Sequence, residues 1–200
     1  MLCAMLFMHP LVQAKNFSKA KLILLNGTIM EGLATFPEGP ASIPIRFKTD
    51  VKSTVQSINS DSIKTIIYTT DAGTTHEYDR LAGYVNGPHE KPERQWLYVV
   101  FRGAVTLYTY AFVGDLNRYN DIQTSWLCIR QGETIASKMT STYWKNKRNI
   151  FVNSTSEYFK DDDELVKKIQ SGAYSWNPVS FIRENKNPLY LSVYYIAYAV

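Results

Sequence analysis

Carboxylates and histidines are the residues of this 200-residue chain that most readily suggest chemistry. Residues 161–164 form an acidic run inside YFKDDDELVKKIQSG, and adjacent carboxylates are the oxygen ligands of hard cations. The spacing favours a helix start instead, because Asp161 stands three residues before Glu164, as in a capping box. We predict a helix capped by Asp161, with a Glu164–Lys168 ion pair and an end at Gly172. No metal site is expected here.

The second candidate is His76, in the sequence HEYDR. On a strand, alternation places His76 and Tyr78 on one face and Glu77 and Asp79 on the other. Sequence neighbours therefore do not form a compact His-Glu-Asp site, and a surface imidazole is the default. A hydrolase built around His76 and Asp79 remains an alternative. The other two histidines lie in the apolar N-terminal stretch and in the loop GPHEKP.

Catalytic motifs and metal motifs are otherwise lacking in the sequence. G-x-S-x-G, H-E-x-x-H, G-x-G-x-x-G and a phosphate loop do not occur. Residues 115–121, DLNRYND, resemble a calcium loop, but Tyr119 takes a ligand position and Asn120 takes that of the turn glycine. Two cysteines are too few for a zinc site of cysteine pairs, and we expect Cys128 to be buried. We predict no cofactor and no metal, and catalytic residues are not assigned.

An aromatic hairpin is the third candidate. Residues 96–112, WLYVVFRGAVTLYTYAF, contain a turn signal at Arg102-Gly103, which would set Tyr98 opposite Leu107 and Leu97 opposite Tyr108. Both faces are largely apolar, so we expect a central hairpin that is covered on both sides. If one face were open, it would offer an aromatic binding platform of Trp96, Tyr98, Tyr108 and Tyr110.

Composition and charge limit the function classes. The net charge of +4 is mild and no long run of like charges occurs, which argues against a nucleic-acid partner. Fourteen Tyr, nine Phe and four Trp favour β structure.

The elements that must position these residues are hairpins first and helices last. Turn signals occur at Asn26-Gly27, Asp71-Ala72-Gly73 and Gln131-Gly132, the last of which sets Arg130 opposite Glu133. Helical spacing follows in residues 151–159 and 161–172, and Asn-Pro at 177–178 predicts a third helix start. The predicted fold class is α+β: an antiparallel β-sheet or partly open barrel of hairpins, followed by two or three short C-terminal helices.

The chain divides into four predicted segments. Residues 1–14 are uncharged, apolar and end in Val-Gln-Ala, which is typical of a secretory signal, although the basic n-region is missing. Residues 15–143 form the β-rich body, and residues 144–187 form a helical segment that packs on the sheet. Residues 188–200 are uncharged and too short for a membrane helix. They form a final strand or, alternatively, an exposed apolar tail.

The order of LILLNGTIMEG, IRFK, SDSIKTIIY, EYDRL, WLYVVFRGAVTLY and EYFKDDDELVKKIQSGAYSW resembles small exported proteins of unknown function that are common in Bacteroidetes. The resemblance covers most of residues 21–185 and implies export and a β-rich fold with short C-terminal helices. It implies no activity, cofactor or catalytic residue. The apolar tail after Pro188 departs from the pattern.

These observations predict an exported, periplasmic or extracellular protein of the cell envelope. We expect a non-enzymatic binding or structural component whose partner is an envelope protein, a peptide or a glycan. The alternatives are an envelope hydrolase and a carbohydrate- or peptide-binding module that uses exposed aromatics. A nucleic-acid partner and a transmembrane helix are not expected.

Overall fold

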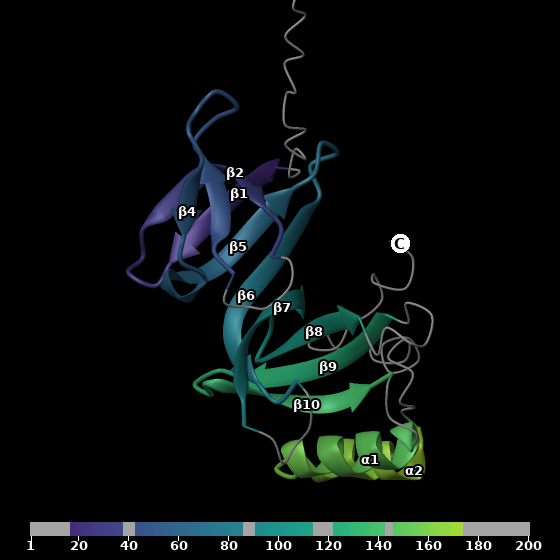
Figure 1. Cartoon of the computed structure of the whole chain (residues 1–200). Coiled ribbons are helices and arrows are strands. Elements are labelled where there is room, and N and C mark those ends of the chain that lie inside the picture. Colours follow the sequence, from purple (N-terminus) through teal and green to yellow (C-terminus); the bar gives the residue numbers. More distant parts are fainter. Residues whose placement is uncertain (1–16, 38–42, 86–90, 114–121, 143–145, 174–200) are drawn as a thin grey trace, which may run out of the picture.

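The computed structural model describes residues 17–37, 43–85, 91–113, 122–142 and 146–173. Ten strands form a single sheet, and two helices follow it, which confirms the α+β class (Figure 1). The predicted signal, the third helix start and the apolar tail lie outside the described residues. The elements are β1 (Phe17–Leu24), β2 (Ile29–Thr35), β3 (Ile45–Lys48), β4 (Gln56–Ile58), a 3-10 turn (Ser60–Ser62), β5 (Ile63–Thr69), β6 (Thr75–Gly83), β7 (Glu93–Phe101), β8 (Val105–Val113), β9 (Ile122–Arg130), β10 (Ile135–Ser141), α1 (Lys147–Tyr158) and α2 (Asp163–Ser171).

The sheet curls in two directions about β6. The strand order is β10-β9-β8-β7-β6-β5-β1-β2-β3-β4, and β10 also pairs with the end of β6. This extra pairing is parallel, at Ile135–Ala82 and Ala136–Gly83, and it closes β6 to β10 into a ring. In Figure 1, β6 runs from the group β1–β5 to the group β8–β10. The ring fits the partly open barrel that the sequence offered as an alternative. Its parallel closing contact was not predicted, because it joins strands about 50 residues apart in sequence.

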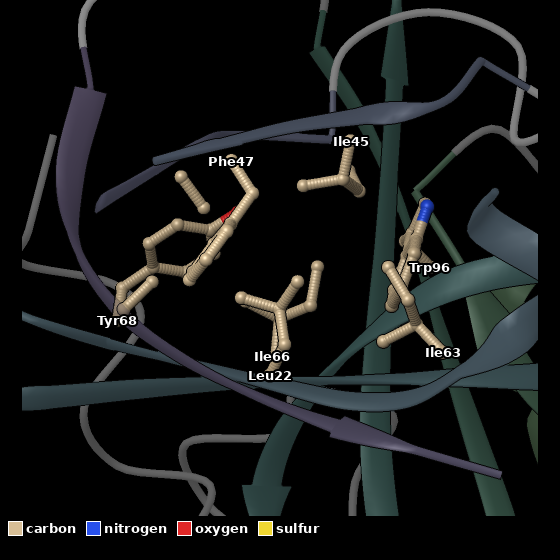
Figure 2. Packing of buried hydrophobic residues seen from close by; sticks show 9 residues of the cluster. Leu22, Ile45, Phe47, Ile63, Ile66, Tyr68 and Trp96 are labelled. Carbon is tan, nitrogen blue, oxygen red and sulfur yellow. The ribbon is translucent and has the colours of Figure 1, made fainter. Parts of the chain in front are cut away.

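The first core lies within the curl of β1 to β5. Alternation sends Ala20 and Leu22 of β1 to the same side as Ile45 and Phe47 of β3. Figure 2 shows how the side chains of this cluster converge, including Trp96 from β7. The cluster consists of Ala20, Leu22, Ala34, Ile45, Phe47, Ile63, Ile66, Tyr68 and Trp96.

Two further cores lie in the other half of the sheet. Inside the ring, Leu97, Tyr108 and Leu127 pack with Val85, Ile129 and Ala136. On the outside of the ring, α1 and α2 cover the strands through Cys128, Met139, Phe151, Phe159, Leu165 and Ile169, and Figure 1 shows both helices beside β10. The helical spacing of residues 151–159 is therefore confirmed.

The three predicted glycine turns are confirmed. At the first, the Leu24 N–H donates to Thr28 O over 2.9 Å, which leaves a loop of three residues in place of the two expected. Gly27 has φ 84°, where a side chain would be strained. The turns at Gly73 and Gly132 have the same positive φ, at 83° and 91°.

The predicted register of the aromatic hairpin is wrong by two residues. Tyr98 pairs with Thr109 and Val99 with Tyr108, and a bulge then sets Phe101 opposite Leu107. An extra bulged residue cannot be read from turn signals alone. Because the shift is even, the side chains of β7 before the bulge keep their predicted faces, whereas Phe101, beyond it, shares the face of Leu107. Both faces of β7 are covered as expected, since Trp96 is buried in the first core and Leu97 inside the ring.

The acidic run starts a helix one residue later than predicted. Asp162, not Asp161, is the N-cap, and its Oδ1 accepts the Leu165 N–H over 2.9 Å. The Glu164–Lys168 ion pair is confirmed at 2.6 Å, and so is the helix end at Gly172, which has φ 80°. No helix among the described residues is long and apolar enough to cross a membrane.

Candidate functional site

The most concentrated polar cluster surrounds Asp79 on β6. This carboxylate is only 6% exposed. It accepts hydrogen bonds from Thr65 Oγ1 at 2.7 Å, from Tyr108 OH at 2.7 Å and from Arg102 Nη2 at 2.8 and 2.9 Å. Glu77 shares Arg102 with it. The cluster thus joins β5, β6, β8 and the turn between β7 and β8.

The pKa shifts in this cluster indicate a structural role, in which every polar group has a hydrogen-bond partner. Burial would lower the pKa of Arg102, but hydrogen bonds to Glu77 and the charge of Asp79 outweigh it and raise the pKa. Burial raises the pKa of Tyr108, and the neighbouring Asp79 charge adds to the effect. Tyr108 is therefore a neutral donor and Arg102 a permanent cation at neutral pH. Both oxygens of Asp79 are occupied, so the cluster holds strands together and offers no ready base.

His76 is not part of this cluster. Its Nδ1 lies 3.3 Å from Tyr98 OH, on the face of β6 opposite Asp79. The alternation predicted from HEYDR is thus confirmed, and the structure does not bring His76 and Asp79 together. His9 and His89 lie outside the described residues.

The four aromatics of the predicted platform are divided between two faces. Trp96 belongs to the first core, and Tyr98 contacts Tyr78 edge-on beside it, with ring centroids 5.2 Å apart. Tyr108 and Tyr110 lie on the inner side of the ring. The four therefore do not form one continuous surface, and ligand binding by any of them stays a prediction.

The described residues offer little for metal binding or nucleophilic catalysis. The described residues contain no group of three or more His, Cys, Asp or Glu side chains that could hold a metal ion. Residues 115–121, which resemble a calcium loop, lie outside the residues that the structure describes. Burial raises the pKa of Cys128 to about 12, so its thiol is neutral and a poor nucleophile.

A solvent-facing surface of β1, β2 and β3 is the feature that the sequence reasoning missed. We call it the outer face and define it by the side chains that alternate with the first core: Phe17, Lys19, Lys21, Ile23, Ile29, Glu31, Leu33, Arg46 and Lys48. The sequence carries a signal for it. In KAKL and IRFK, basic residues alternate with buried apolar ones, as on a sheet with one solvated face.

The outer face combines cations with apolar side chains. Arg46 Cζ and Lys48 Nζ lie 5.8 and 5.0 Å from the centre of the Phe17 ring. Lys21 pairs with Glu31 over 3.4 Å. Lys19, Arg46 and Lys48 form no ion pair with any residue that the structure describes. The arrangement can attract an anionic partner but contains no catalytic group.

A second polar cluster attaches the helices to the sheet. The guanidinium of Arg130, at the end of β9, binds both carboxylate oxygens of Asp161 at 2.8 and 2.6 Å and the carbonyl of Tyr158 at 3.0 Å. Arg130 and Glu133 lie opposite each other at the turn, as predicted, and the Glu133 N–H donates to the Arg130 carbonyl over 3.1 Å. The guanidinium of Arg130, however, binds Asp161 and forms no ion pair with Glu133. Glu133 instead accepts the Arg130 backbone N–H at 2.9 Å and Tyr158 OH at 2.7 Å. Helix docking, which the sequence does not reveal, decides the partner of Arg130.

Replacing Arg130 with alanine is expected to loosen α1 and α2 while leaving the first core intact. The change removes the bidentate contact to Asp161 and a donor at the C-terminus of α1. Hydrogen exchange should increase in residues 147–171 and stay unchanged in β1 to β5. Arg130→Lys keeps the charge but not the planar fork, so it should give an intermediate effect. Equal loosening in both halves of the sheet would contradict this role.

No family model matches the chain, and neither a curated protein nor a solved structure matches it, so the similarity to exported Bacteroidetes proteins stays a prediction.

Proposed function

We propose that the protein is an exported component of the cell envelope that acts by binding a partner through its outer face, without catalysis. Export is supported by the uncharged, apolar residues 1–14 and by the sequence resemblance. Binding is supported by the geometry of β1, β2 and β3.

The observation that carries the proposal is the composition of the outer face. On an antiparallel sheet with one solvated face, the solvent positions are normally polar. Here Phe17, Ile23, Ile29 and Leu33 occupy such positions among four cations. Ile29 is 54% exposed, and Phe17, Ile23 and Leu33 are half-buried. Partly exposed apolar side chains among cations favour an interaction site.

The hydrolase alternative has less support. It needs His76 and Asp79 to converge, but they lie on opposite faces of β6. Asp79 is also occupied by three donor side chains. The aromatic alternative would need a shared face for Trp96 and Tyr108, and these two residues belong to different cores.

Photo-crosslinking in cells tests both parts of the proposal. A crosslinking amino acid at Ile29, on the outer face, should give discrete adducts in the envelope fraction. The same amino acid at Lys167, exposed on α2, is the matched control and should give none. Lys19→Glu/Lys48→Glu should abolish the Ile29 adducts. Deleting residues 1–14 should leave the protein in the cytoplasm, and unchanged export would refute the localisation. Identical adducts at both positions would refute the binding surface.

A further inference from the structure

We infer that the partner of the outer face is an acidic polypeptide surface that also carries apolar side chains. The inference rests on the binding part of the proposed function and specifies the chemical class of the partner. It does not depend on where the protein resides.

The charge of the outer face requires an anionic partner. Strands β1, β2 and β3 contain four cations, Lys19, Lys21, Arg46 and Lys48, against the single carboxylate of Glu31. Asp50, in the loop after β3, accepts the N–H groups of Lys52 and Ser53 at 2.7 and 2.9 Å and keeps its charge, which interacts with that of Lys48. With Asp50 included, four cations still stand against two carboxylates. The face therefore keeps an excess of positive charge, which complements and steers a negative surface.

The apolar side chains lie in or beside the cross-strand rows that contain the cations. Ile23 pairs with Ile29, and Leu33 lies between Lys19 and Lys48. Ile29 is 54% exposed, although such a side chain gains by burial. A partner that supplied charge alone would leave this apolar surface in water. The rows therefore fit a partner with both carboxylates and apolar side chains.

A second copy of the chain does not fit the outer face. In a two-fold dimer the same patch meets itself. Such a dimer would bring Lys19, Arg46 and Lys48 against their own counterparts. Like charges that face each other across an interface cost several kcal/mol, so this mode of self-association is disfavoured.

Glycans and membranes fit less well than a polypeptide. Phe17 is the only aromatic on the defined outer face, and Arg46 and Lys48 already lie near its ring, which leaves little room for a sugar to stack. Insertion into a bilayer needs apolar groups that protrude into the headgroup region. Phe17, Ile23 and Leu33 are half-buried, so Ile29 is the one largely exposed apolar side chain of the outer face, which is little for insertion.

The test uses the purified full chain and three defined probes. The first is a labelled short peptide in which Glu and Asp alternate with Val and Leu, compared with a counterpart that carries Lys in place of the acids. The second is vesicles of phosphatidylcholine and phosphatidylglycerol, and the third is polygalacturonate. Binding is followed by fluorescence anisotropy for the peptides and by co-sedimentation for the vesicles and the polysaccharide, at low and high salt.

We expect the acidic peptide to bind in preference to the lysine peptide, with weaker binding at high salt. Lys19→Glu/Lys48→Glu should weaken binding at least about tenfold. Lys91→Glu/Lys167→Glu carries the same charge change at exposed sites away from the outer face and should bind as the wild type does. Ile29→Ser should weaken binding at both salt concentrations, because it removes apolar contact. Thermal unfolding of each variant verifies that it is folded.

Failure to bind the acidic peptide, or equal loss in both double variants, would overturn the inference. Tighter binding to the vesicles or to polygalacturonate would assign the face to a lipid or a glycan and would also overturn it. These outcomes leave the envelope localisation untouched, because the purified protein is tested outside the cell. Cytoplasmic localisation with intact peptide binding would refute the export proposal alone.

Discussion

Asp79→Ala is expected to lower the free energy of unfolding by about 2–4 kcal/mol, because two buried hydroxyl donors lose their acceptor. The substitution removes the acceptor of Thr65 Oγ1 and Tyr108 OH, and one of the two carboxylate partners of Arg102. Both hydroxyl donors are buried within the sheet, so they would then lack a hydrogen-bond acceptor. Urea unfolding followed by tryptophan fluorescence measures the loss.

Two variants of the same cluster provide the control for Asp79→Ala. Glu77 binds the same arginine from a more exposed position, so Glu77→Ala should cost no more than about 1 kcal/mol. Tyr108→Phe removes one hydrogen bond to the Asp79 carboxylate and should cost about 1.5–3 kcal/mol. If Asp79→Ala and Glu77→Ala had equal effects, the network would not be the structural centre described above.

Gly32→Ala is expected to cost about 3 kcal/mol, the upper end for overpacking a core. A Cβ at Gly32 would lie 2.1 Å from the Lys48 carbonyl oxygen and 2.8 Å from Phe47 Cζ. The carbonyl belongs to the backbone of β3 and cannot rotate away, so β2 and β3 must separate. The outer face spans these two strands, and binding of the acidic peptide should weaken together with stability.

Gly73→Ala is the matched control for Gly32→Ala. No atom lies within 4 Å of a Cβ at Gly73, and only its φ of 83° opposes a side chain. The expected cost is about 1 kcal/mol, from left-handed backbone strain alone. Equal destabilisation by the two substitutions would show that contact between β2 and β3 is not what requires glycine at position 32.

Local signals predicted the hairpins well and their registers less well. Gly27, Gly73 and Gly132 each lie at a turn, because the positive φ that a tight turn requires is a property of the residue itself. The register between β7 and β8 was missed because a bulge separates the pairs Val99–Tyr108 and Phe101–Leu107. A bulge adds one residue without changing the hydrophobic alternation enough to reveal it.

Contacts between distant segments decided the roles of the charged residues. Arg130 lies opposite Glu133 as predicted, but its guanidinium binds Asp161, which follows α1 and reaches it once the helices dock. The N-cap of α2 is Asp162 and not Asp161, which the sequence predicted. Both are good N-caps by residue type, so local preference could not separate them.

The sequence by itself determined the α+β class, the turns, the two helices and which side of β6 each residue occupies. These follow from short-range preferences and from the two-residue period of a strand. Only the tertiary structure decided that β10 closes onto β6 and that Asp79 meets Arg102 and Tyr108. It also decided that the basic side chains of β1 to β3 share one face of the sheet. Such features depend on which distant strands meet, and that choice reflects the packing of the whole core and no local pattern.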